Sequence, residues 1–171
     1  MKKNSIFAII SVILLIGLDQ LVKILITSHM ALPATVPVIK NVFHITYIQN
    51  RGAAWGSLQG KRILLLAVTL LVLIFLVYFY IKMLKMDKYK DLRILFLFVF
   101  SGAVGNMIDR IRLGYVIDMF DFRLINFPVF NVADIYVTCS MIILLIFILF
   151  KYKDNELEDL FGGSKKASDK E

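Results

Sequence analysis

Four long apolar runs, separated by short polar segments, constrain the fold of this 171-residue chain more than any other feature of its sequence. The runs cover residues 6–26, 63–81, 94–108 and 135–150. A helix needs about 20 mainly apolar residues to cross the hydrocarbon core of a bilayer. The chain is 59% hydrophobic and 19% charged, which is more apolar than an ordinary soluble domain. We therefore predict an integral membrane protein with spans at about residues 6–26, 62–82, 93–110 and 133–151.

The third and fourth runs are short for a membrane span unless their polar ends enter the membrane. Those ends carry Asn106 and Asp109 on the third run and Asp134 on the fourth. We therefore expect these three side chains at or just inside the membrane boundary.

The positive charges predict the orientation of the chain. Of the 20 Lys and Arg residues, 12 lie in the N-terminus, the loop after the second run and the C-terminal tail, and eight lie on the other side, in the remaining two loops and the adjoining ends of the spans. Basic residues concentrate on the cytoplasmic side, so both termini are expected there. The same placement beside the spans accounts for the net charge of +7 without a nucleic-acid partner.

Residues 1–153 are predicted to form one membrane domain, and the charged tail 154–171 is predicted to be disordered.

Cysteine and histidine are too scarce for a metal centre or an internal disulfide. The chain has one cysteine, Cys139, and two separated histidines, His29 and His44. Structural metal sites need clusters of such ligands at short spacing. We therefore predict no metal and no cofactor.

The two outward loops carry β-strand signals. In residues 38–48 of the first loop, Phe43, Ile45 and Tyr47 alternate with His44 and Thr46. Similar apolar material occurs in the second loop at residues 115–117 and 127–130. Alternation over such a stretch is typical of a half-buried strand. The predicted fold is an all-α membrane protein of four transmembrane helices with a small extracytoplasmic β-sheet.

Acidic residues gather at the predicted outward boundary of the membrane. Five of the 13 lie there: Asp19, Asp109, Asp118, Asp121 and Asp134. Ionisable groups at the membrane boundary are costly, and five at one level indicate a functional site. Helical spacing places Asn106, Asp109 and Arg110 on one face, as it does Asn131 with Asp134 and Asp19 with Lys23.

Each pattern also has a purely structural interpretation. Asp19 and Lys23 would make an intrahelical ion pair, and Asn131 with Asp134 would cap a helix. Gly102 and Gly105 would allow close helix packing. Their coincidence at one membrane face favours a site instead. Two carboxylates that share a proton activate water and protonate a leaving amine. Spacing alone does not decide which aspartates do so among Asp109, Asp118, Asp121 and Asp134.

Five ordered sequence blocks resemble the lipoprotein signal peptidases, also called signal peptidase II, over the whole chain up to the tail. The blocks are DQLVK at 19–23, NRGAAWG at 50–56, GAVGNMIDR at 102–110, VID at 116–118 and FNVAD at 130–134. The resemblance implies an aspartyl endopeptidase of the bacterial cytoplasmic membrane, with its site at the outer face. It also implies a short surface helix at residues 51–58, which we expect to act as a flap.

The resemblance assigns roles to single residues of this chain. It implies that Asp118 and Asp134 are catalytic. It implies that substrate and catalytic pair are positioned by Asn50, Gly52, Asn106, Asp109, Arg110 and Asn131. Asp19 and Lys23 would support them. The implied substrate is a prolipoprotein already carrying diacylglycerol, cut just before the modified cysteine. The implied partners are that substrate and membrane lipid, and the chain is expected to act as a monomer.

Other functions fit the sequence less well. A small multi-pass transporter or channel would use boundary aspartates as an ion path, but it would need polar residues in mid-span, and the second run has essentially none beyond Thr69. Prepilin-type and presenilin-type proteases use a Gly-x-Gly-Asp motif, which does not occur here. A non-catalytic scaffold would leave the clustered carboxylates unexplained.

Overall fold

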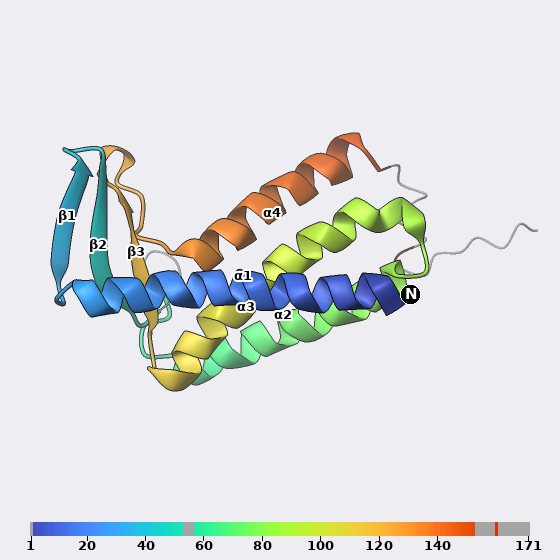
Figure 1. Cartoon of the computed structure of the whole chain (residues 1–171), viewed down its shortest axis with the longest axis horizontal. Helices are drawn as coiled ribbons and strands as arrows, with labels where there is room; N and C mark the ends of the chain where they lie inside the picture. Colours follow the sequence, from blue (N-terminus) through green and yellow to red (C-terminus); the bar gives the residue numbers. More distant parts are fainter. Residues whose placement is uncertain (1, 53–56, 153–159, 161–171) are drawn as a thin grey trace, which may run out of the picture.

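A computed structural model describes residues 2–52, 57–152 and 160 of the chain. Four long helices form an elongated bundle, and a three-stranded sheet lies at one end of it (Figure 1). The N-terminus lies at the opposite end. This confirms the predicted fold class of four apolar helices with a small sheet.

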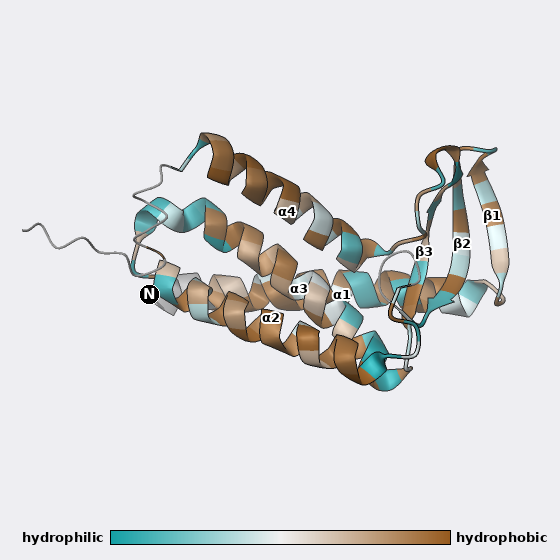
Figure 2. Ribbon diagram, turned by 180° about the vertical axis from the view of Figure 1, so that it is seen from behind, coloured by the Kyte–Doolittle hydropathy of each residue, from teal (hydrophilic) through white to brown (hydrophobic). Residues whose placement is uncertain are grey.

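The four helices are long and apolar enough to cross a bilayer. They are α1 (Lys2–His29), α2 (Arg62–Met83), α3 (Lys90–Arg112) and α4 (Val132–Phe150). Even α4, with 19 residues, spans about 28 Å at 1.5 Å per residue. Apolar residues dominate the middle of the bundle, and polar residues gather at its ends (Figure 2). In α3 the helix extends through the polar ends of its apolar run, which explains why the run alone looked too short.

The sheet is antiparallel, in the order β1 (Ala34–Ile39), β2 (Phe43–Asn50) and β3 (Val116–Phe122). The single strand signal at residues 38–48 covers parts of β1 and β2, because the chain turns between them at Asn41, whose φ is 60°. Ile48 pairs with Asp118, and Asn50 pairs with Val116. This register brings the end of β2 beside the beginning of β3, with Asn50 two residues from the partner of Asp118.

The helix α3 is the centre of the bundle and packs against α1, α2 and α4. Two glycines make the contact with α4 close. A Cβ at Gly102 would lie 2.5 Å from the carbonyl oxygen of Ala133, and one at Gly105 would lie 3.5 Å from the Cβ of Ala133. The first turn of α4 is therefore held against the middle of α3.

A small apolar core joins the sheet to α1. Ile117 and Met119 of β3 are buried there with Tyr47 of β2, and they pack against Val22 and Ile26 of α1. Successive side chains of a strand point to opposite faces. Asp118, which lies between Ile117 and Met119, therefore projects from the other face of β3. Half of the surface helix predicted at residues 51–58, namely residues 53–56, lies outside the described residues, and the described residues 51, 52, 57 and 58 are not helical.

Candidate active site

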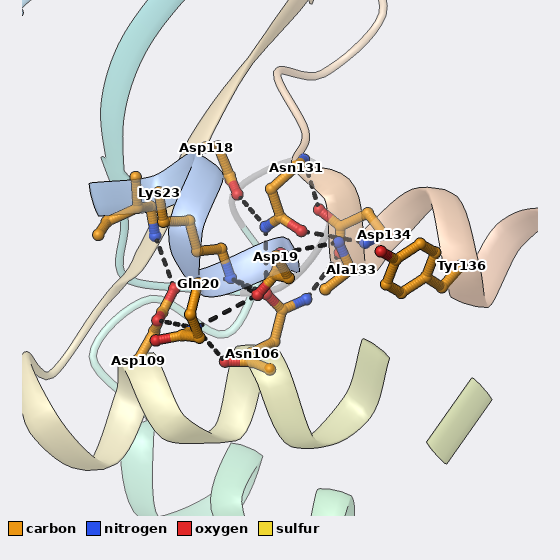
Figure 3. Close-up of polar contacts among 12 residues, drawn as sticks. Asp19, Gln20, Lys23, Asn106, Asp109, Asp118, Asn131, Ala133, Asp134 and Tyr136 are labelled. Carbon is orange, nitrogen blue, oxygen red and sulfur yellow. Dashed lines mark hydrogen bonds and ion pairs between the residues drawn. The ribbon is translucent and has the colours of Figure 1, made fainter. Parts of the chain in front are cut away.

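Lys23, on α1, is buried and surrounded by acceptors (Figure 3). Its Nζ lies 2.9 Å from Oδ2 of Asp19 and 2.8 Å from Oδ2 of Asp109, and it donates to Oδ1 of Asn106 over 3.0 Å. These contacts use all three N–H bonds of the ammonium group. Gln20 adds a hydrogen bond of 2.9 Å to Oδ1 of Asp109. The cluster joins α1 to α3 through buried, fully paired charges.

Asp19 also holds the beginning of α4. Its Oδ1 accepts the backbone N–H of Ala133 over 2.9 Å. The first N–H groups of a helix have no partner within the helix, and a negative charge beside them is favourable. Gly105 makes room for this contact, because a Cβ there would lie 2.6 Å from Oδ2 of Asp19.

Asn131 and Asp134 cap α4 reciprocally. The side-chain oxygen of Asn131 accepts the backbone N–H of Asp134 over 3.0 Å, and Oδ2 of Asp134 accepts the backbone N–H of Asn131 over 3.1 Å. This is a capping box, in which each residue satisfies the main-chain donor of the other. The capping box fixes the Asp134 carboxylate at the N-terminus of α4, where Asp134 is partly exposed.

Two amides connect Asp134 to Asp118 of β3 (Figure 3). Nδ2 of Asn131 donates to Oδ1 of Asp118 over 2.6 Å and to Oδ1 of Asn106 over 3.1 Å. Nδ2 of Asn106 in turn donates to Oδ1 of Asp134 over 2.8 Å. Asn50, at the end of β2, donates to the second oxygen of Asp118 over 2.9 Å. Strand, loop and helix thus place two carboxylates in one hydrogen-bonded chain.

The setting of Asp118 changes its acidity. Burial, followed by the neighbouring charge of Asp134, raises the pKa of Asp118 to about 7. The amides of Asn50 and Asn131 and the charge of Lys23 act in the opposite direction without cancelling this rise. Asp118 therefore exchanges a proton near neutral pH, as a group in acid–base catalysis must.

A loop after β2 is anchored to the same network. The backbone N–H of Gly52 donates to Oδ1 of Asn50 over 2.9 Å, and its carbonyl accepts Nη2 of Arg110 over 3.0 Å. A Cβ on Gly52 would collide with the carbonyl oxygen of Ser57. Glycine is therefore required here by the close approach of two backbone segments.

The structure divides the five boundary aspartates into those that belong to the hydrogen-bonded network and one that does not. Four belong to the network: Asp19, Asp109, Asp118 and Asp134. Asp121 does not, since it projects from the face of β3 opposite to Asp118. It accepts instead from Thr46 over 2.7 Å and from Arg123 over 2.9 Å. The other predicted site residues lie in the network or one contact from it: Lys23, Asn50, Gly52, Asn106, Arg110 and Asn131.

Two members of the network were not identified from the sequence. Gln20 carries no charge and was noticed only as part of the 19–23 block, although it binds Asp109 and the carbonyl of Gly105. The backbone N–H of Ile117, which donates to Oδ2 of Asp109 over 3.3 Å, has no side-chain signal at all. Through it, Asp109 holds the strand one residue before Asp118.

The described residues contain no group of three or more His, Cys, Asp or Glu arranged to hold a metal ion. The network contains instead a proton-exchanging carboxylate, a second carboxylate at a helix N-terminus, and amide donors between them. Such a pair suits the activation of water by general acid–base catalysis.

Known proteins are similar to this chain in sequence and in fold. The sequence model of the signal peptidase (SPase) II family matches residues 11–150. The "Lipoprotein signal peptidase" of Clostridioides difficile is 46% identical over 142 residues, which are 83% of this chain and 94% of that protein. The protein of the same name from Streptococcus pyogenes serotype M6 is 42% identical over 154 residues, 90% of this chain and 98% of its own.

Solved structures agree with the sequence comparison. One bacterial membrane enzyme superposes with a TM-score of 0.76 at 31% identity, covering 96% of this chain and 94% of that one. A second superposes with a TM-score of 0.74 at 34% identity, covering 85% and 94%. The four apolar helices and these neighbours identify a multi-pass membrane protein. The chain belongs to the signal peptidase II family of proteases.

Proposed function

We propose that this protease removes the signal peptide from diacylglyceryl-modified bacterial prolipoproteins by an aspartyl mechanism, cutting just before the lipidated cysteine. The observation that carries the proposal is the pair of amides, on Asn131 and Asn106, that links Asp118 to Asp134. The names of the relatives support the substrate class. In this proposal Asp118 and Asp134 are the catalytic residues.

The pair acts by sharing one proton. The ionised carboxylate takes a proton from a water molecule, and the water oxygen attacks the carbonyl carbon of the scissile bond. The protonated carboxylate gives its proton to the leaving amine as the C–N bond breaks. The pKa of Asp118, raised to about 7, suits this exchange at neutral pH. No metal or cofactor takes part.

The surrounding residues divide into two groups. Asp19, Lys23 and Asp109 are buried and bound to one another, so they position the catalytic pair without touching substrate. Asn50, Gly52 and Arg110 form the edge of the site at the loop, where the extended peptide would bind. We expect the loop to close over the peptide as a flap. Asn106 and Asn131 orient the carboxylates directly.

The position of the site suits a lipidated substrate. The network lies where the helices meet the sheet, at one end of the bundle (Figure 1). We assign this end to the outer face of the cytoplasmic membrane, with both termini in the cytoplasm. A peptide cut there would keep its acyl chains in the bilayer while its backbone reached the carboxylates. All residues of the site come from one chain, so we expect a monomer.

A transporter or channel is not favoured. Its ion path would need polar groups within the spans. The hydroxyl of Thr69, in the middle of α2, donates to the carbonyl of Leu65 of the same helix over 2.8 Å and so is already bound.

The test compares a diacylglyceryl-modified prolipoprotein with its unmodified twin, using purified protein in detergent and a gel shift as the readout. We expect cleavage of the modified substrate alone. Asp118→Asn and Asp134→Asn should each abolish it, while Asp121→Asn, the matched control on the other face of β3, should retain it. Chelator in the assay should have no effect.

Each result bears on a different part of the proposal. Failure on a substrate that another enzyme of this family cuts would overturn the proposed function. Cleavage by a folded Asp118→Asn or Asp134→Asn variant at the normal rate would keep the function and refute the catalytic pair. Loss of activity in the Asp121→Asn variant with an unchanged melting temperature would show that the wrong aspartate had been excluded.

A further inference from the structure

Two adjoining cavities lie between α1, α2 and α3, in the half of the bundle remote from the sheet and the candidate active site. The first, of about 250 Å³, is apolar and includes Val12, Val77 and Phe100 in its lining. The second, of about 270 Å³, is partly polar and is lined among others by Arg93. Tyr80 and Leu97 line both. The two cavities therefore adjoin at these residues, and together we call them the groove, which is apolar at one end and charged at the other.

Arg93 is an unusual residue in this groove, because it is buried and incompletely paired. It is only 7% exposed, and its Nη1 has no hydrogen-bond partner among the described residues. Its Nη2 lies 3.8 Å from Oδ1 of Asp87, whose side chain is fully exposed. A buried charged donor without a partner is costly, so its position indicates a ligand that completes it.

The fold fixes Arg93 in this position. Leu92 and Leu95 of α3 belong to the apolar core at this end of the bundle. Arg93, Leu97 and Phe100 follow one another at spacings of four and three residues, so they share a different face of α3, the one that lines the groove. The helix packing therefore places the backbone of Arg93 on the side of α3 that faces the groove.

The charges around the groove favour an anion. Lys90, one turn before Arg93, also lines the second cavity and is exposed. Asp91, its neighbour, is bound to Lys151. Among the described residues that line this cavity, Asp87 is the one carboxylate, and its exposed side chain can turn to water as an anion enters.

We propose that the groove binds one anionic glycerophospholipid, with its phosphate on Arg93 and Lys90 and one acyl chain along the apolar cavity. An arginine fork matches the oxygens of a phosphate, and the apolar lining matches a hydrocarbon chain at the same depth in the bilayer. The headgroup lies near the end of the helices, as a lipid phosphate does at the membrane surface. This site is separate from the catalytic pair and goes beyond the proposed function.

The test is a lipid titration of delipidated protein in detergent, read by native mass spectrometry. Phosphatidylglycerol is compared with phosphatidylcholine of the same acyl chains. Both lipids carry a phosphodiester, but the choline of phosphatidylcholine would bring a second positive charge beside Arg93 and Lys90. We therefore expect the wild-type protein to prefer phosphatidylglycerol by about tenfold or more. Arg93→Gln should abolish this preference, and Lys85→Gln, an exposed charge at the same end that does not line the groove, should keep it.

A second variant tests the acyl end without changing any charge. Val77→Trp fills the apolar cavity and should weaken binding of both lipids, while deacylated glycerophosphoglycerol should not compete with the whole lipid. Melting temperature and substrate cleavage confirm that each variant is folded.

The proposal is overturned if the wild-type protein shows no preference for phosphatidylglycerol, or if folded Arg93→Gln keeps that preference. It is likewise overturned if the deacylated headgroup competes as well as the lipid, because the anion would then bind without the apolar groove. Unchanged lipid binding by the Val77→Trp variant would have the same consequence.

Discussion

The side-chain amide of Asn131 donates to Oδ1 of Asp118 over 2.6 Å while the side-chain oxygen of the same residue caps α4. One side chain thus couples the strand that carries one carboxylate to the helix that carries the other. The position of Asp118 relative to Asp134 is set by this residue more directly than by the long connection between them.

The two tasks of Asn131 separate by substitution. A serine hydroxyl still caps a helix, but it has no amide to donate to Asp118. Both variants lose the hydrogen bonds of the buried amide, but only Asn131→Ala also loses the cap, so Asn131→Ser should be more stable than Asn131→Ala by about 1 kcal/mol. Both should lose about 100-fold in kcat, because catalysis depends on correctly placed acid and base groups. Thermal melts and steady-state kinetics on a lipopeptide check both effects, and near-normal kcat in Asn131→Ser would contradict the coupling.

The pH dependence of kcat/KM should follow the ionisation of Asp118. Loss of the shared proton ends activity, so kcat/KM should fall as pH rises through about 7, the pKa of Asp118. Asn50 donates to this carboxylate and so favours its ionised form. Asn50→Ala should raise the pKa and move the alkaline limb to higher pH. Gln49→Ala, on the neighbouring residue of β2, should leave the limb in place. A limb that stays fixed or moves to lower pH in Asn50→Ala would exclude Asp118 as its source.

Lys23 should be essential for stability. Its removal leaves the carboxylates of Asp19 and Asp109 buried without their cation. Lys23→Met should lower the free energy of unfolding by about 3–5 kcal/mol, because breaking a buried pair leaves an uncompensated charge. Lys40→Met, at an exposed position, should change it by less than about 0.5 kcal/mol. Denaturant unfolding in micelles measures both, and equal stability of the two variants would refute the role of the cluster.

Two glycines in spans should respond oppositely to the same substitution. A Cβ at Gly105 would lie 2.6 Å from Oδ2 of Asp19, so Gly105→Ala should destabilise the protein by about 1–3 kcal/mol. Nothing lies within 4 Å of a Cβ at Gly17. Gly17→Ala should therefore stabilise α1 by about 0.5–1 kcal/mol. Thermal melts of both variants in the same detergent test these opposite changes. An unchanged melting temperature of Gly105→Ala would contradict the close packing of α1 and α3.

Helical spacing predicted the contacts within single helices, because residues three or four apart lie on the same face of a helix. Asp19 and Lys23 do form the expected ion pair, and Asn131 with Asp134 does cap α4. In both cases the structural interpretation is confirmed, and the same residues belong to the network of the candidate site. The spacing did not show that Asp109 shares Lys23, because that contact joins two helices.

The sequence could not separate Asp118 from Asp121. Their difference depends on the faces of β3 and on its pairing with β2, and strand register is set by contacts between distant segments. Likewise, the continuous strand signal at residues 38–48 concealed the turn at Asn41. The family resemblance, rather than the spacing, named Asp118 and Asp134. The predictions for residues 53–56 and for most of the tail lie outside the described residues and remain predictions.

The contact between Asp19 and the backbone of Ala133 has a consequence for biogenesis. It joins the first membrane helix to the opening turn of the last. A chain emerging from the ribosome inserts α1, α2 and α3 before α4 exists, so Lys23 can pair with Asp19 and Asp109 while Asp19 still lacks the backbone N–H of Ala133. The carboxylate of Asp134 reaches its place only when α4 enters the bilayer. The hydrogen bond from Asn106 of α3 to Asp134 is therefore among the last contacts between the helices to form.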